Sequence, residues 1–262
     1  MPTEPVPEVL FVCSAKVRAD VAAALQARFD LGIELPEHIR PVYESHLAYS
    51  DDLGEAFYEA GPSADFTEIL YIYRTESLEE AKKLMQADPL YAAGIFHDDS
   101  YFEWHIHPPL YKSRLPFMPE QVQEVEVEVT TPRTLIASYG TFDLQPMKAW
   151  QEGKAPRPLF QLLHLHNLYG EGGTATMGIT WACGPNADLD KALHILAVPS
   201  IEMAKFHNEM DALYRWGIVS DFRYFEWCIH YPRRKATPRH RVVLGDLAES
   251  TQRGQHPREY PA

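Results

Sequence analysis

Two short stretches, Gly61-Pro62-Ser63-Ala64-Asp65 and Tyr101-Phe102-Glu103-Trp104, decide the fold, because each occurs a second time in the chain. The first returns as Gly184-Pro185-Asn186-Ala187-Asp188 and the second as Tyr224-Phe225-Glu226-Trp227, each 123 residues later. From Gly61 to Pro109, 23 of 49 positions are identical in the two copies. Self-similarity at one fixed offset indicates a tandem duplication.

Both copies predict the same order of secondary structure. Short apolar runs predict four strands in each copy, at 9–13, 56–60, 68–73 and 95–107 and at 135–139, 179–183, 192–197 and 218–230. Ser77 and Ser200 are good N-caps for the helices that precede the last strands. The order β-α-β-β-α-β is the ferredoxin-like arrangement. We therefore expect an α+β protein built from two ferredoxin-like βαββαβ repeats.

This periodicity divides the chain into four segments. Residues 1–109 form the first ferredoxin-like repeat, and residues 132–232 form the second. Between them, residues 110–131 are a linker in which the alternation of Glu and Val at 124–129 predicts an extra strand. The tail, 233–262, is basic, because residues 231–262 hold seven basic and three acidic side chains. It is expected to be disordered or to fold back on the acidic body.

Composition limits the class of protein. The 262 residues carry a net charge of -13, which argues against a nucleic-acid partner. Three cysteines imply no disulfide framework. No apolar run is long enough to cross a membrane, and the N-terminus lacks the pattern of a signal peptide. We expect a cytoplasmic protein with a small-molecule substrate and no membrane partner.

Several motifs of the first copy resemble the YCII-related family. They are a His-Leu-x-Tyr element, a Gly-Pro turn, a Ser-x-Glu-Glu-Ala helix start, an Asp-Pro turn and an Ile-His-Pro end, at His46–Tyr49, Gly61-Pro62, Ser77–Ala81, Asp88–Phe96 and Ile106–Pro108. The second copy departs from the pattern at Asp211-Ala212, where the first has Asp88-Pro89. The family belongs to the dimeric α/β-barrel superfamily. The resemblance implies one barrel within the chain, formed by its two repeats, and leaves a homodimer or higher homo-oligomer open.

The resemblance also implies chemistry. The family includes a dehydrochlorinase that acts on a chlorinated hydroxyhydroquinone, and its His and Asp look like an acid-base pair. By position these are His46 and Asp88, with His166 and Asp211 as counterparts. An imidazole is suited to proton transfer near neutral pH, and a carboxylate can fix its tautomer. The alternative is that His46 is an exposed helix-end residue and that Asp88 caps a turn.

Polar side chains alternate with apolar ones in the last strand of each copy. We predict that Phe102, Trp104 and Ile106 face the helices, while the alternate side chains face the barrel interior. Those alternate residues are Tyr101, Glu103, His105 and His107 in the first copy and Tyr224, Glu226, Cys228 and His230 in the second. We expect the Tyr, Glu and His members, with Tyr49, to bind substrate. A structural network and a metal site are the alternatives.

The favoured function is a cofactor-independent lyase or isomerase, similar to a dehydrochlorinase or a muconolactone isomerase. It would act on a small oxidised aromatic compound or ring-cleavage product, as in aromatic degradation. Two alternatives stay open: a non-catalytic ligand-binding or assembly module, and a haem- or metal-dependent barrel enzyme. The non-catalytic alternative predicts a packed barrel and no pocket beside His46.

Overall fold

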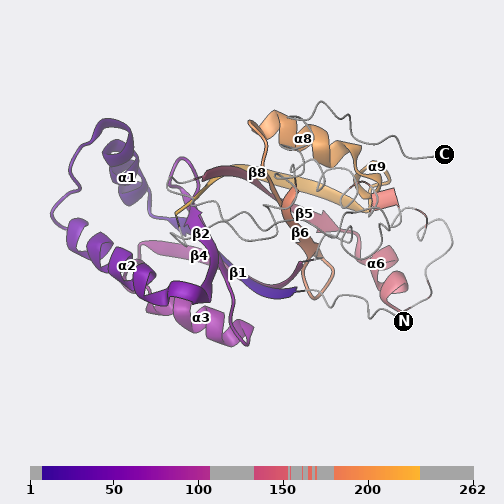
Figure 1. Cartoon of the computed structure of the whole chain (residues 1–262), viewed down its shortest axis with the longest axis horizontal. Helices are drawn as coiled ribbons and strands as arrows, with labels where there is room; N and C mark the ends of the chain where they lie inside the picture. The colour runs from indigo at the N-terminus through magenta and orange to yellow at the C-terminus, as the bar shows by residue number, and fades with distance from the viewer. Residues whose placement is uncertain are drawn as a thin grey trace, which may run out of the picture.

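A computed structural model shows two four-stranded antiparallel sheets, one from each copy (Figure 1). It describes residues 8–106, 133–152, 154, 161, 165, 166, 169 and 180–230. The first sheet has the order β2-β3-β1-β4 and the second the order β6-β7-β5-β8. Their strands are β1 (Glu8–Val17), β2 (Phe57–Pro62), β3 (Glu68–Tyr73), β4 (Phe96–Ile106), β5 (Arg133–Phe142), β6 (Thr180–Pro185), β7 (Lys191–Leu196) and β8 (Val219–Ile229). The predicted α+β fold of two ferredoxin-like repeats is confirmed.

Helices cover the outer face of each sheet. The first unit has α1 (Ala19–Leu31), α2 (Arg40–Leu53), a short 3-10 helix (Gly54–Ala56), α3 (Leu78–Ala87) and α4 (Pro89–Ala92). The second unit has α6 (Leu144–Gln151), α8 (Ile201–Met210) and α9 (Ala212–Arg215). The predicted N-caps form, because the hydroxyls of Ser77 and Ser200 accept the backbone N–H groups of Glu80 and Met203, both at 3.2 Å.

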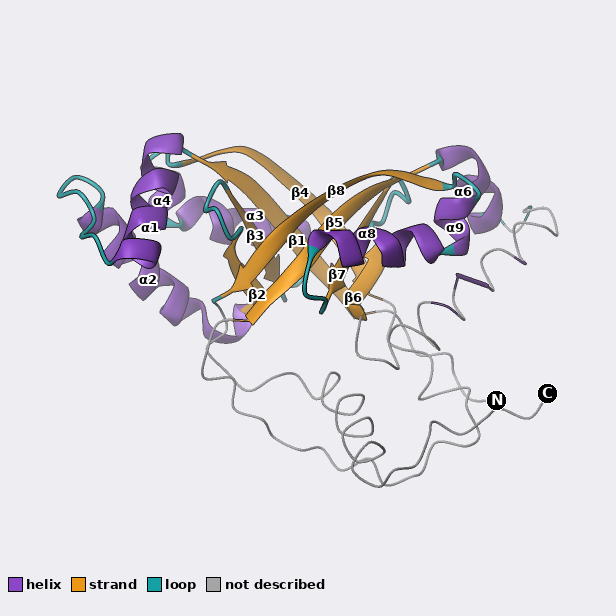
Figure 2. Ribbon diagram, turned by 90° about the horizontal axis from the view of Figure 1, so that it is seen from above, coloured by secondary structure: helices purple, strands orange, loops and turns teal. Residues whose placement is uncertain are grey.

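The two sheets pack face to face around one apolar core, with the helices outside (Figure 2). This core takes seven buried side chains from each unit: Leu10, Val12, Tyr58, Leu70, Ile72, Phe102 and Trp104 from the first, and Leu135, Ala137, Ala182, Leu193, Ile195, Phe225 and Trp227 from the second. A barrel closed by the two repeats of one chain explains why the duplication is intact around these strands.

Two tryptophans join the units in a pseudo-symmetric way. The indole N–H of Trp104 donates to the carbonyl of Gly184, and the indole N–H of Trp227 donates to the carbonyl of Gly61, both at 3.0 Å. Backbone bridges accompany these bonds, between Trp104 and Asn186 and between Trp227 and Ser63. The repeated Gly-Pro and Phe-Glu-Trp motifs therefore form the hydrogen-bonded contacts that join the two units.

The prediction of which strand face points inward was wrong. Phe102 and Trp104 fill the barrel, whereas Tyr101 packs against the helix-side core of the first unit and Tyr224 against that of the second. Alternation could not decide the matter, because both faces of these sheets are buried. In β1, for example, Leu10 and Val12 face the barrel while Phe11 and Cys13 face the helices. The two largest fully buried side chains, Trp104 and Trp227, lie in the space between the sheets.

Some predictions fall on parts of the chain that lie outside the described residues. These are the linker 110–131 with its extra strand, His107, and the basic tail 233–262. The predicted segment boundaries stay predictions. Among the described residues, none of the helices is long and apolar enough to cross a membrane.

Candidate active site

Asp88 lies at the sharp junction between α3 and α4. Its extended backbone ends α3, and its Oδ1 accepts the backbone N–H of Leu90 at 2.8 Å, which caps α4. Pro89 occupies the first position of α4, where a missing N–H costs nothing. The alternative in which Asp88 caps a turn is therefore correct, and the carboxylate is held rigidly with 0% of its surface exposed.

His46 meets this carboxylate from α2. Its Nδ1 lies 2.8 Å from Oδ2 and 3.0 Å from Oδ1 of Asp88. Because a carboxylate only accepts hydrogen bonds, Nδ1 is the protonated nitrogen of the neutral ring and Nε2 carries the lone pair. The residue as a whole is 7% exposed, so His46 is buried and is not the exposed helix-end residue of the alternative. Asp88 thus caps a helix and orients a histidine at the same time.

The second unit repeats this pair. Nδ1 of His166 lies 2.6 Å from Oδ2 of Asp211, and Oδ1 of Asp211 accepts the N–H of Leu213 at 2.7 Å. Burial raises the pKa of Asp211, but the hydrogen bond and charge of His166 outweigh it, and the pKa lies below its ordinary value of 3.8. The side chain of His166 is 26% exposed, against 9% for His46. The two pairs share their chemistry and differ in burial.

Tyr49 and its counterpart Tyr169 hold the helices that carry these histidines. The Tyr49 hydroxyl donates to the carbonyl of Leu84 in α3 at 2.7 Å, and the Tyr169 hydroxyl donates to the carbonyl of His207 in α8 at 3.0 Å. Burial, with the charge of Asp88, raises the pKa of Tyr49 to about 12. A neutral hydroxyl that donates to a backbone carbonyl fits a structural role, in which Tyr49 ties α2 to α3. Tyr49 does not line the pocket described next.

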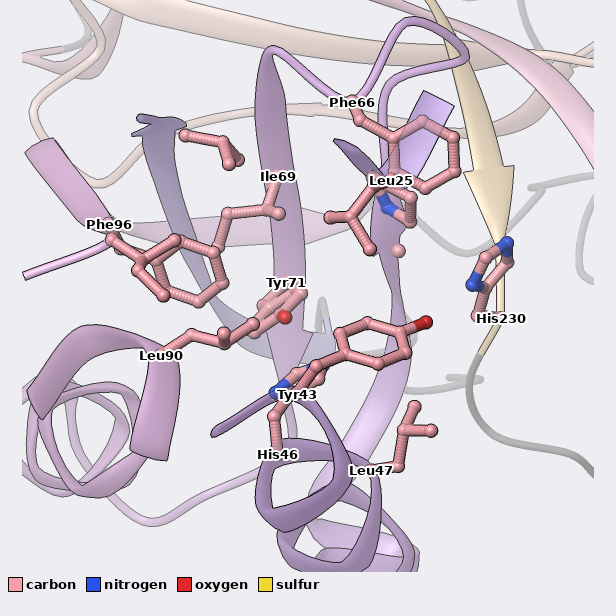
Figure 3. A pocket seen from close by; sticks show the side chains of 14 residues that line it. Leu25, Tyr43, His46, Leu47, Phe66, Ile69, Tyr71, Leu90, Phe96 and His230 are labelled. Atoms are coloured by element: carbon pink, nitrogen blue, oxygen red, sulfur yellow. The ribbon is translucent and has the colours of Figure 1, made fainter. Parts of the chain in front are cut away.

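A pocket opens beside His46, between the outer face of the first sheet and the surrounding helices (Figure 3). It encloses about 520 Å³, including the part that is open to solvent. Besides His46, its polar side chains are Tyr43 from α2, Tyr71 from β3 and His230, which follows β8 of the second unit. Apolar residues from α1, α4 and the strands complete the wall. The structure therefore brings His46 and His230 together in one pocket.

Aromatic rings surround the imidazole of His46. Phe96 meets it edge-on with a centroid distance of 6.4 Å, and Tyr43 lies 6.1 Å away on the same helix. Tyr71 in turn packs edge-on against Phe96 at 6.2 Å. Such a wall suits a small, flat, apolar ring.

The other predicted substrate-binding residues lie elsewhere. His105 pairs with Glu103 at 2.6 Å on the outer face of β4, and Glu226 is exposed on β8. The Tyr224 hydroxyl accepts the side-chain N–H of Asn208 at 3.1 Å, and burial raises its pKa to about 12. Tyr101 is half-buried on the helix side of β4, and burial raises its pKa. None of these five side chains lines the pocket beside His46.

The pocket residues Tyr43, Tyr71 and Phe96 were missed in the sequence. One signal was available for Tyr43, because a residue three positions before His46 on a helix shares its face. Tyr71 and Phe96 come from strands on either side of the sheet's centre, so no local spacing links them to His46. Within the described residues, no three His, Cys, Asp or Glu side chains gather closely enough to hold a metal ion.

The described fold and pocket define a class: a tandem pair of ferredoxin-like units that closes one dimeric α/β barrel. A solved structure with a TM-score above 0.5 agrees with this fold. A mutant chlorite dismutase from Candidatus Nitrospira defluvii is 12% identical, with 92% of this chain and 96% of that chain covered and a TM-score of 0.51. A 5-chloro-2-hydroxyhydroquinone dehydrochlorinase from Burkholderia phenoliruptrix is 26% identical, with 37% of this chain and 95% of that chain covered and a TM-score of 0.28.

A scan of protein families finds a match in the first unit. Residues 9–105, the segment that holds His46 and Asp88, match the YCII-related domain. A search of the curated proteins found no match. The sequence motifs from His46 to Ile106 had indicated the same family.

Proposed function

We propose that the chain is an enzyme, a lyase or isomerase that works by proton transfer on a small oxidised aromatic compound or ring-cleavage product. The observation that carries this proposal is the His46–Asp88 pair at the wall of an aromatic pocket. Asp88 leaves Nε2 of His46 as the basic nitrogen, and the pocket gives a flat ring access to it. His166 and Asp211 form the same pair in the second unit and stay candidates for a second site.

His46 would act as a general base. Its Nε2 accepts a proton from an acidic O–H or C–H group of the substrate, whose bonding electrons stay on the ring. In a lyase the proton is passed to the ring carbon that bears the chlorine, and loss of a second hydroxyl proton then supplies the electron pair that expels chloride. In an isomerase the proton returns at another carbon. The Asp88 carboxylate stabilises the imidazolium that forms, because it already accepts the Nδ1–H bond. Apolar walls strengthen this interaction by excluding water.

The aromatic wall supports the substrate class. Tyr43, Tyr71 and Phe96 line the pocket with aromatic rings, against which a flat ring could pack. The resemblance to the YCII-related family, whose members include a dehydrochlorinase for a chlorinated hydroxyhydroquinone, supports an oxidised or hydroxylated ring. Removal of one proton and one chloride from such a ring yields a hydroxyquinone and needs no added oxidant.

The test is turnover by the purified protein. The panel contains 5-chloro-2-hydroxyhydroquinone, followed by chloride release and quinone absorbance, and an unsaturated ring-cleavage lactone, followed by the shift of its double bond. We expect turnover of at least one compound, and its loss in His46→Ala with the circular dichroism spectrum unchanged. His38→Ala is the matched control, since His38 is exposed and lies outside the pocket. Full activity in both His46→Ala and His166→Ala would exclude the proposed mechanism.

The structure bears on the two alternatives differently. A packed barrel interior was expected for a non-catalytic module, and the apolar core between the sheets has that character. The same alternative expected no pocket beside His46, and the observed pocket counts against it. The haem- or metal-dependent alternative stays a prediction, which metal analysis and an absorption spectrum of the purified protein test directly.

A further inference from the structure

The second unit reaches into the pocket of the first. Strand β8 runs along the edge strand β2, and the backbone N–H of His230 donates to the carbonyl of Ala60 at 2.9 Å. Nearby, the backbone N–H of Ala64 donates to the carbonyl of Glu226 at 2.9 Å, and the Trp227 indole bonds to Gly61. Three hydrogen bonds in this short stretch fix the end of β8 against the first unit.

Gly61 makes this close approach possible. A Cβ atom at this position would lie 1.8 Å from the carbonyl oxygen of Cys228 and 3.1 Å from the backbone nitrogen of His230. Both neighbours are backbone atoms, so neither can turn aside as a flexible side chain would. A glycine is therefore required where β8 crosses β2, and its absence would push His230 away from the pocket.

The side chain of His230 faces the same pocket as His46. Figure 3 shows His46 on α2 and His230 past the end of β8 on different sides of the pocket, with the ring of Tyr43 between them in that view. The imidazole of His230 lies 5.8 Å from the ring of Phe29, which stacks on Phe66 at 4.9 Å. Of the residues that line the pocket, His230 alone comes from the second unit.

We infer that His230 is a second catalytic residue of this pocket, so that the active site is shared by the two fused units. The inference rests on the proposed function. When Nε2 of His46 removes a proton from a hydroxyl of a hydroxyquinone, the O–H bond breaks and its electron pair spreads through the conjugated double bond to a carbonyl oxygen on the other side of the ring. An imidazole N–H of His230 donates a hydrogen bond to that oxygen and stabilises its charge.

Two imidazoles from different elements suit this division of roles. Asp88 accepts a hydrogen bond from Nδ1 of His46, which leaves Nε2 as the acceptor of that ring, whereas His230 follows strand β8 of the second unit. The first unit by itself holds the base, and the second unit supplies His230. The fusion of the repeats would therefore keep the donor in register with the base, without the need for a separate partner chain.

The experiment measures binding of 2,5-dihydroxybenzoquinone, a hydroxylated quinone, to the full chain by isothermal titration calorimetry. It compares the wild type with His46→Ala, His230→Ala and His230→Phe, and uses His38→Ala as the matched control. Thermal unfolding of each variant identifies any loss of fold. His230→Phe keeps a ring at this position and removes the N–H donor, so that it reports on the site if His230→Ala fails to fold.

We expect His230→Ala to weaken binding about tenfold or more, since a hydrogen bond to a charged group is lost, while His38→Ala binds as the wild type does. If His46→Ala weakens binding but both His230 variants match the His38→Ala control, the shared site is wrong and the proposed function stands. If the wild type binds neither this quinone nor any compound of the panel, the proposed function fails and the shared site fails with it.

Discussion

Replacement of Asp88 by Asn separates its role in catalysis from its role in the fold. The amide oxygen can still accept the Leu90 N–H that Oδ1 now accepts at 2.8 Å. The amide NH2 then faces Nδ1 of His46 as a donor, so Nδ1 must become the acceptor and the proton must move to Nε2. His46 would present an N–H to the pocket in place of its lone pair, and it could no longer remove a proton.

The expected magnitudes follow from these contacts. Asp88→Asn exchanges a charge-assisted hydrogen bond for a neutral one, which lowers the free energy of unfolding by about 1 kcal/mol. The wrong tautomer lowers turnover by roughly 10³–10⁴-fold, the scale of the corresponding change in Ser-His-Asp enzymes. Asp88→Ala removes both bonds and leaves two buried N–H groups without acceptors, and we expect a loss of about 2–5 kcal/mol of stability.

Urea unfolding and turnover of the best panel substrate measure the two effects. Asp211→Asn is the matched control, because Asp211 makes the same two contacts in the second unit. Its effect on stability should resemble that of Asp88→Asn, whereas turnover at the His46 pocket should persist. A folded Asp88→Asn variant that keeps more than about a tenth of the wild-type turnover would refute the tautomer argument.

Three further predictions concern the barrel and the second unit. Trp104→Phe and Trp227→Phe should each lower the free energy of unfolding, measured in urea, by about 1–3 kcal/mol, because each leaves a buried glycine carbonyl without its donor. A change below about 0.5 kcal/mol in both variants, which is the size of a neutral surface substitution, would contradict the role of these hydrogen bonds in joining the units. Gly61→Ala should lower the stability of the protein far more than Gly94→Ala. An alanine at position 94 meets nothing within 4 Å of its Cβ, and its left-handed φ of 64° costs only about 1–2 kcal/mol. Equal melting temperatures of the two variants would refute the close approach of β8 to Gly61. Folding lowers the pKa of Asp211, so the stability that this carboxylate contributes is complete above its ordinary pKa of 3.8 and is lost as the pH falls through the lower pKa of the folded state. In Asp211→Asn the free energy of unfolding should therefore fall less steeply as the pH is lowered. An unchanged pH dependence would contradict the ion pair with His166.

The repeated motifs were enough to predict the fold. The offset of 123 residues relates three strands of the second unit to those of the first, β6, β7 and β8, and Ser77 and Ser200 correctly marked the helix starts. This works because strand order and capping depend on local patterns that duplication preserves. The inward face of the strands was predicted wrongly, because Trp104 and Tyr101 are both large and partly or wholly buried, and their spacing alone cannot distinguish two covered faces.

The site was predictable only in part. The pair of His46 and Asp88 followed from the family resemblance, and the distance between its atoms came only from the structure. His230 was predicted to bind substrate from its place on a polar strand face, and it reaches the pocket for a different reason, the docking of β8 on β2 at Gly61. Contacts between units far apart in the chain depend on how the sheets pack, which a single sequence does not display.

A crystal structure of the full chain with 2,5-dihydroxybenzoquinone tests the central claim most directly. The account predicts the ring in the pocket against Tyr71 and Phe96, with Nε2 of His46 and an imidazole nitrogen of His230 each about 2.6–3.2 Å from one of its oxygens. A ring bound elsewhere on the chain, or bound in the pocket with no contact to Nε2 of His46, would contradict it.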